Sequence, residues 1–108
     1  METTKVLGQA IPVAATLTTL YTVPGGTSTV VSTLMACNQA LTSTSIRVAV
    51  AVAGAADTEK QYLYRDLTLT GLNSLALTAG LTLAATDVIR AYSLSGLVSF
   101  NLFGVEVS

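Results

Sequence analysis

The sequence has very few charged residues. Asp, Glu, Lys and Arg make up only 10% of its 108 residues, while hydrophobic residues make up 51%; an ordinary globular domain is about 25% charged. This small number of charged residues cannot cover the exterior. We therefore expect either a surface of Thr, Ser, Ala and Gly, or an apolar surface that is covered by partner proteins. The net charge is −1 and the five basic residues are scattered. Nucleic-acid binding is not expected, because phosphate recognition requires clustered positive charge.

Histidine is absent, so the commonest general base and metal ligand is missing. Cys37 is the only cysteine, which excludes an intrachain disulfide and a cysteine zinc site; we expect a small buried residue in a reducing compartment. Asp57 and Glu59 are spaced like two calcium ligands, but a calcium loop requires a longer series of oxygens, so a solvated loop is favoured. No phosphate-binding glycine loop or serine-nucleophile motif occurs. The sequence predicts no catalytic residue, no cofactor and no metal.

Two further acidic residues lie close to arginines in the sequence. Arg65 precedes Asp66, and Asp87 is followed by Arg90, so edge salt bridges are favoured over a catalytic acid pair. Asp87 also suits a turn-capping role, because its short carboxylate can accept hydrogen bonds from nearby backbone N–H groups.

Long apolar runs and secretion signals are also missing. Thr and Ser interrupt every run before about 18 consecutive apolar residues are reached, so no membrane span is expected. The first residues, METTK, lack the basic and apolar regions of a signal peptide.

The residues that are abundant favour β-structure. Thr, Val and Ile are frequent and strong helix formers are scarce. Ile46, Val48, Val50 and Val52 alternate with Arg47, Ala49 and Ala51, the period of a half-buried strand. Turn residues such as those at 24–26 separate similar runs, and helix is weakly indicated only at 53–62. The expected strands are 16–23, 27–37, 44–53, 61–69, 74–83 with a possible break at Gly80, 87–93 and 97–107.

Seven or eight antiparallel strands at this spacing predict an all-β domain, a single β-sandwich of the jelly-roll type or a small barrel. We expect Val48, Val50, Leu67, Leu69, Val88, Phe100 and Leu102 in its core.

Residues 1–15 form a separate segment in this interpretation, ahead of a β-sandwich domain at 16–108. They contain Val6, Leu7, Ile11 and Val13 but little alternation, and Pro12 interrupts strand pairing. We expect an extended N-terminal arm that places these four side chains against a neighbouring subunit. A short edge strand or a frayed terminus is the alternative.

Aromatic residues offer one further candidate contact. Tyr62 and Tyr64 lie two residues apart and would share one face of a strand. They would form either the rim of the core or a tyrosine patch at a subunit interface. A sugar-stacking site is a weaker alternative, because the chain has no Trp.

Several short motifs occur together in an order typical of one group of proteins. They are LGQ at 7–9, LYTVPGGT at 20–27, CN at 37–38, YLY at 62–64, LAATDV at 83–88 and SFNLFG at 99–104. In this ordered series the chain resembles small virion structural proteins of tailed phages over nearly its whole length. The resemblance implies a virion component that assembles in the cytoplasm of the bacterial host.

The favoured hypothesis is therefore a capsid decoration, or cement, protein that binds the major capsid protein lattice and stabilises it. The alternative is a tail, baseplate or fibre component that acts as an adaptor or receptor-binding module. A cellular binding domain and an enzyme are further alternatives. We expect a homo-oligomer, with a trimer favoured, because a closed ring would bury the remaining apolar strand faces.

Overall fold

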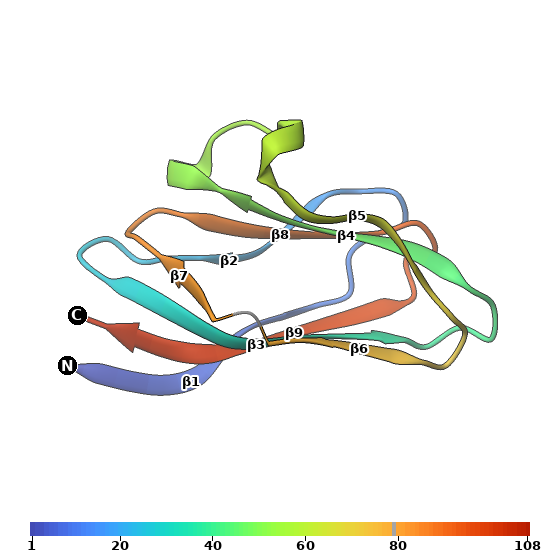
Figure 1. The fold of residues 1–108 in the computed structure, drawn as a ribbon, viewed down its shortest axis with the longest axis horizontal. Coiled ribbons are helices and arrows are strands. Elements are labelled where there is room, and N and C mark those ends of the chain that lie inside the picture. The colour runs from blue at the N-terminus through green and yellow to red at the C-terminus, as the bar shows by residue number, and fades with distance from the viewer. Residues whose placement is uncertain (79) are drawn as a thin grey trace.

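In a computed structural model, which describes residues 1–78 and 80–108, the chain forms two antiparallel β-sheets packed face to face (Figure 1). The expected all-β sandwich is confirmed. In chain order the elements are β1 (Glu2–Ala10), β2 (Thr18–Thr22), β3 (Ser28–Asn38), β4 (Thr44–Ala51), the 3-10 turns η1 (Val52–Gly54) and η2 (Glu59–Gln61), β5 (Tyr62–Leu69), β6 (Ser74–Leu77), β7 (Leu81–Leu83), β8 (Val88–Ser93) and β9 (Val98–Val107).

The chain passes back and forth between the two sheets. Sheet A has the order β1-β9-β3-β6, with β7 also paired to β3, and sheet B has the order β2-β8-β4-β5. β6 lies opposite residues 34–37 of β3 and β7 lies opposite residues 29–31, so the two follow one another along the same side of β3. If β6 and β7 are taken as one interrupted strand, two four-stranded sheets connected in this way form a jelly roll.

An observed strand occupies every expected segment, although β3 continues one residue past 37 to Asn38, and the segment 74–83 is divided as Gly80 suggested. Residue 79 lies outside the described residues. Helix within 53–62 is limited to the two three-residue 3-10 turns. Among the described residues, no helix has the length and apolar character required to cross a membrane.

The N-terminal segment differs from the expectation of an extended arm. Residues 2–10 form β1, which pairs antiparallel with β9 from Glu2 opposite Val107 to Ala10 opposite Phe100. Leu7 is buried in the core. The arm interpretation is wrong for these residues because β9 offers them a hydrogen-bonding edge, and pairing also removes Leu7 from water. The alternative of an edge strand is correct.

The core lies between the sheets and contains Phe100, Leu34, Ile46, Ile89 and Leu102, all fully buried. The expectation is correct for five of the seven predicted core residues, which are Val48, Leu69, Val88, Phe100 and Leu102. Val50 and Leu67 are partly buried against this core.

The alternation in β4 does not continue as far as expected. Val52 is 70% exposed, because β4 ends at Ala51 and the chain then turns through η1.

A polar group lies between the sheets near the chain termini. The Tyr21 hydroxyl donates to Glu106 Oε2 at 2.6 Å and lies 2.8 Å from Thr29 Oγ1. Lys5 Nζ is 3.0 Å from Glu106 Oε1. The hydrogen bond from Tyr21, which has the larger effect, and the hydrogen bond from Lys5 hold the pKa of Glu106 below its usual value. Burial, followed by the hydrogen bond to Glu106, raises the pKa of Tyr21 to about 12. These contacts join β1, β2, β3 and β9.

Candidate protein-interaction surfaces

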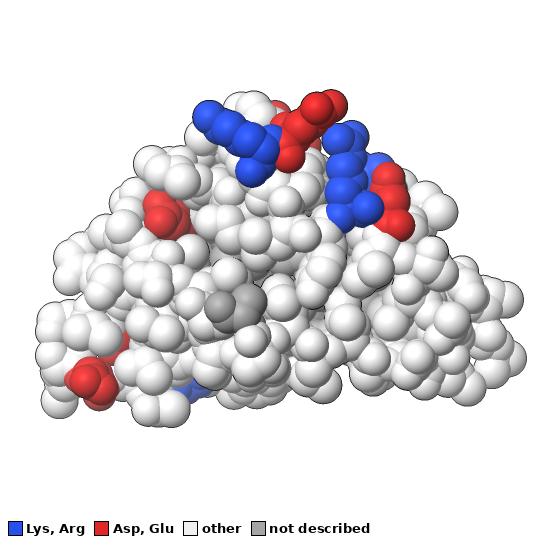
Figure 2. Space-filling view, in the orientation of Figure 1, with Lys and Arg blue, Asp and Glu red and all other residues white. Residues whose placement is uncertain are grey.

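Charged side chains are concentrated on one side of the molecule. Figure 2 shows most of the visible Lys, Arg, Asp and Glu along its upper rim, over η2, β4 and β5, whereas the right-hand end is free of them. A few further charged side chains appear at the left and lower left of this view, and the rest of the face shown is uncharged.

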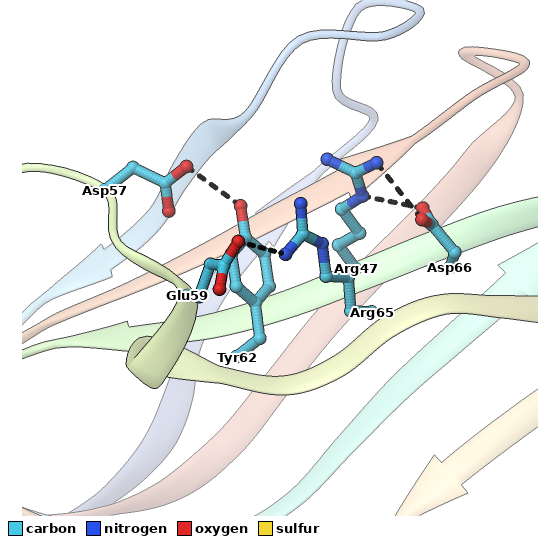
Figure 3. A network of polar contacts seen from close by, with 6 residues as sticks. All are labelled: Arg47, Asp57, Glu59, Tyr62, Arg65 and Asp66. Atoms are coloured by element: carbon cyan, nitrogen blue, oxygen red, sulfur yellow. Dashed lines mark hydrogen bonds and ion pairs between the residues drawn. The ribbon is translucent and has the colours of Figure 1, made fainter.

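Six side chains of the charged region lie in a network of polar contacts (Figure 3): Arg47, Asp57, Glu59, Tyr62, Arg65 and Asp66. Arg47 donates through Nε to Asp66 Oδ1 at 2.7 Å and through Nη2 to Asp66 Oδ2 at 3.2 Å. Arg65 lies 3.6 Å from Glu59 and stacks over the Tyr62 ring at 5.3 Å. Most of these groups are well exposed, and exposed ion pairs contribute little to stability. Their mutual pairing favours a solvated surface.

The expected salt bridges of Asp66 with Arg65 and of Asp87 with Arg90 do not form as predicted. Asp66 binds Arg47 on the neighbouring strand rather than Arg65. It has a φ of 57° at an irregularity between β4 and β5, and the hydrogen bond from Arg47 lowers its pKa. Arg90 donates to the carbonyl of Ala55 at 2.9 Å.

Asp87 caps a turn, as its sequence context indicated. Its carboxylate accepts hydrogen bonds at 2.9 Å from the backbone N–H groups of Ala53 and Ala84. These bonds tie the β7–β8 turn to η1.

Tyr62 and Tyr64 lie on opposite faces of β5, contrary to expectation. Val48 is the partner of Tyr64 and Ala49 is the partner of Tyr62, with a register shift between them. Successive residues of β4 point to opposite faces, so their partners do as well. Tyr64 packs against the core, while Tyr62 donates to Asp57 at 3.0 Å in the charged region. The two rings do not form one tyrosine patch.

One pocket of about 400 Å³ lies beside η1 and η2 and is lined by Val50, Val52, Ala55, Lys60 and Gln61. The Gln61 amide is already used, since Nε2 donates to the carbonyl of Ala56 at 2.9 Å. Within the described ranges, no group of three His, Cys, Asp or Glu is placed to hold a metal ion. Each buried side-chain nitrogen or oxygen described has a hydrogen-bond partner. This pocket therefore presents little that would orient a ligand.

The uncharged end of the sandwich is formed by four loops, which we call the loop tip: residues 11–17, 39–43, 70–73 and 94–97. They contain no Asp, Glu, Lys or Arg and meet at the right-hand end in Figure 1. Of the twelve exposed large hydrophobic residues among those that the structure describes, six belong to the tip: Ile11 (56% exposed), Val13 (72%), Leu41 (84%), Leu72 (65%), Leu94 (56%) and Leu97 (52%). This concentration of apolar side chains without charge is typical of a protein-binding surface.

Backbone hydrogen bonds hold the four loops together. Leu72 N–H donates to the carbonyl of Ala40, Gln39 N–H donates to that of Leu97, and Ala15 N–H donates to that of Ser93, all at 2.9 Å. Each bond joins residues that are far apart in the sequence, so the tip is one continuous surface.

Asn38 is the central residue beneath the tip and is fully buried. Its Nδ2 donates to the carbonyls of Thr42 (3.0 Å), Leu69 (3.1 Å) and Thr70 (3.2 Å). Its Oδ1 accepts from the N–H of Ala40 at 3.0 Å. One side chain thus ties the β3–β4 loop to the end of β5.

Two glycines allow the loops to approach closely. A Cβ at Gly71 would lie 2.1 Å from the carbonyl oxygen of Leu41. Gly96 has a φ of +74°, and a Cβ there would lie 2.8 Å from Ala14 N. Side chains at either position would push the loops apart.

The structure places the predicted interface residues in different surroundings. Ile11 and Val13 lie in the tip, and Val6 is 49% exposed on β1, whereas Leu7 and Tyr64 contribute to the core or pack against it. Sequence reasoning missed Leu41, Leu72, Leu94 and Leu97. The signal that could have found them is a leucine within a short polar segment rich in Gly, Ser or Asn.

Cys37 was expected to be buried but is partly exposed. It lies on β3 between buried Ala36 and Asn38 and opposite Ser99 of β9. By strand alternation its side chain points out of sheet A.

No known protein-family model matches this chain, and no curated protein sequence matches it.

Proposed function

We propose that this protein is a non-enzymatic structural subunit that docks onto other protein subunits through its loop tip. The observation that carries the proposal is the set of six exposed large apolar residues on four loops that contain no charge. An apolar surface of this kind binds by losing contact with water, and no ionic group has to be desolvated.

The size of the effect is of the order that specific binding requires. Burying a fully exposed large apolar side chain contributes about 1.5–3 kcal/mol, so six that are 52–84% exposed contribute about 6–12 kcal/mol before the costs of association. Those costs are about 4–15 kcal/mol and increase when loops must become ordered. The tip loops are already joined by hydrogen bonds and by Asn38, which limits the ordering cost.

We further propose that the partner belongs to a phage particle and that the protein is a capsid decoration protein on the major capsid protein lattice. The resemblance to tailed-phage virion proteins supports this assignment. The jelly roll agrees with it, since viral capsid domains and lectins both use this architecture, although architecture alone does not establish a function. The tip loops contain no Tyr, Phe or Trp, which favours a protein partner over a glycan.

Particle composition tests this placement. The encoding phage should be purified and the ratio of this chain to the major capsid protein measured by quantitative mass spectrometry. A fixed ratio set by capsid symmetry is the expected result. A small copy number that follows the tail proteins would indicate the tail, baseplate or fibre alternative, and absence from purified particles would refute a virion role.

The docking surface requires a separate test with matched variants. Leu41→Lys combined with Leu72→Lys places two charges in the tip. The control, Val52→Lys combined with Leu63→Lys, changes two exposed apolar residues outside it. Occupancy is measured on particles assembled without this protein and incubated with each chain. We expect the tip variant to bind at least about tenfold more weakly, because burying unpaired charge is costly, and the control to bind like the wild type. Equal occupancy of all three would refute the tip as the docking surface.

A further inference from the structure

A second uncharged surface lies on the outside of sheet A, separate from the tip. Along β9, Leu102 and Gly104 are buried and the intervening Phe103 is partly exposed. Strand alternation therefore directs Phe103 and Val105 away from the core. Val30 of β3 is 42% exposed, between buried Thr29 and Val31, and points the same way.

These side chains form cross-strand rows. Val6 of β1 is paired with Phe103, and Phe103 with Thr33 of β3. In the next row Thr4 is paired with Val105, and Val105 with Val30. Apolar residues therefore occupy the middle of the face, with hydroxyl side chains beside them.

Charge is nearly absent from this face. Glu2 points outward with its partner Val107, at the end of the β1–β9 ladder. Lys5 is opposite the buried Gly104 and binds Glu106, which the buried Tyr21 also contacts, so this pair faces the space between the sheets. The outside of sheet B, in contrast, has the ion pairs of Arg47 and Arg65.

We propose that a second copy of this chain packs on this face, sheet A against sheet A, across a two-fold axis. The strands of sheet A contain 37 residues in all, and at about 3.4 Å per residue and about 4.8 Å between strands they give a face of about 600 Å². Two copies would then bury about 1,200 Å², at the lower end of the range of about 1,200–2,000 Å² for stable specific interfaces. A two-fold interface brings each residue close to its own copies, and a face with charge only at one corner accepts this without opposing like charges.

The same argument specifies a dimer rather than the trimer favoured by the sequence. A ring of three requires two different complementary patches on each subunit, whereas the outside of sheet A is a single patch that a two-fold axis would pair with its own copy. The proposal does not depend on the tip, which lies at one end of the sandwich.

The test uses one charged substitution on each sheet. Val30→Glu places a carboxylate in the middle of the sheet A face, and Thr68→Glu places one at an exposed position of β5 in sheet B. Analytical ultracentrifugation over a concentration series should give twice the chain mass of 11.1 kDa for the wild type and Thr68→Glu. We expect Val30→Glu to weaken dimerisation at least about tenfold, since two like charges would face one another. Circular dichroism checks that both variants are folded.

Cys37 supplies a second measurement that uses the unmodified protein. Its thiol lies on the same face and is partly exposed, so its reaction with a maleimide should slow at least about fivefold from dilute to concentrated protein as the face is covered. A Cys37→Ser, Thr68→Cys variant should react at a rate independent of concentration. A wild-type monomer or trimer, or a Val30→Glu dimer of unchanged affinity, would overturn the proposal. Tip variants that fail to bind particles but still dimerise would contradict neither the dimer nor its interface, so the dimer proposal and the tip-docking proposal are tested independently.

Discussion

Replacing Asn38 with Ala should destabilise the fold and disturb the loop tip in particular. The two hydrogens of Nδ2 are donated to three carbonyl oxygens, one of them shared, and Oδ1 accepts from the N–H of Ala40; the side chain is fully buried. A buried hydrogen bond contributes about 0.5–1.5 kcal/mol net, and groups left without partners raise the cost. We expect a loss of about 3–5 kcal/mol in the free energy of unfolding, a large part of the total of about 5–15 kcal/mol typical of a domain.

Urea unfolding of Asn38→Ala and the wild type, followed by circular dichroism, measures this loss. The matched control is Asn101→Ala, whose side chain accepts one hydrogen bond from Gln9 at the surface and should cost less than about 1 kcal/mol. Amide hydrogen exchange at Ala40 and Leu72 should also accelerate in Asn38→Ala, since the Ala40 N–H bonds to Asn38 itself and the Leu72 N–H bonds to the carbonyl of Ala40. A loss below about 1 kcal/mol with unchanged exchange would refute the assignment of Asn38 as the residue that organises the tip.

Three further perturbations test the packing. The pKa of Tyr21 is raised to about 12 from 10.0, so the folded state retains a proton that the unfolded chain releases. Its stabilising contribution is complete below about pH 10 and is lost as the pH rises towards 12. The free energy of unfolding of Tyr21→Phe, measured with urea, should therefore change less between these pH values than that of the wild type. An equal change in both proteins would contradict a buried phenol. Gly71→Ala should lower the free energy of unfolding by about 1–3 kcal/mol, because its Cβ would lie 2.1 Å from the carbonyl oxygen of Leu41. Gly25→Ala is the control and should have little effect, because the space around Gly25 is open. Similar melting temperatures for the two variants would contradict this packing. Deleting residues 2–10 should prevent cooperative unfolding in a thermal melt, because it removes β1 and Leu7 from sheet A; a truncated chain that melts like the wild type would show that β1 is not an integral strand.

Local pattern was sufficient to predict the fold class and most strands. The alternation at Ile46 and Val48 and the turn residues between the runs depend only on neighbours in the sequence, and β3, β4 and β9 formed where the pattern placed them. Scarcity of charge likewise indicated that apolar surface would remain uncovered, and the exposed leucines of the tip agree with it.

Long-range contacts decided the rest. The assignment of residues 2–10 to an edge strand depends on an edge of β9 whose paired residues lie 90 to 105 positions away in the sequence, from Ala10 opposite Phe100 to Glu2 opposite Val107. A register shift between β4 and β5 places Tyr62 and Tyr64 on opposite faces. The alternation of residues within β5 does not predict such a shift, because the shift depends on the partner strand. The loop tip exists only because the β1–β2, β3–β4, β5–β6 and β8–β9 loops meet at one end of the jelly roll, where hydrogen bonds between distant residues hold them together. β-structure and a surface with little charge follow from residue composition and local alternation, whereas contacts between distant residues specify which apolar side chains face solvent together.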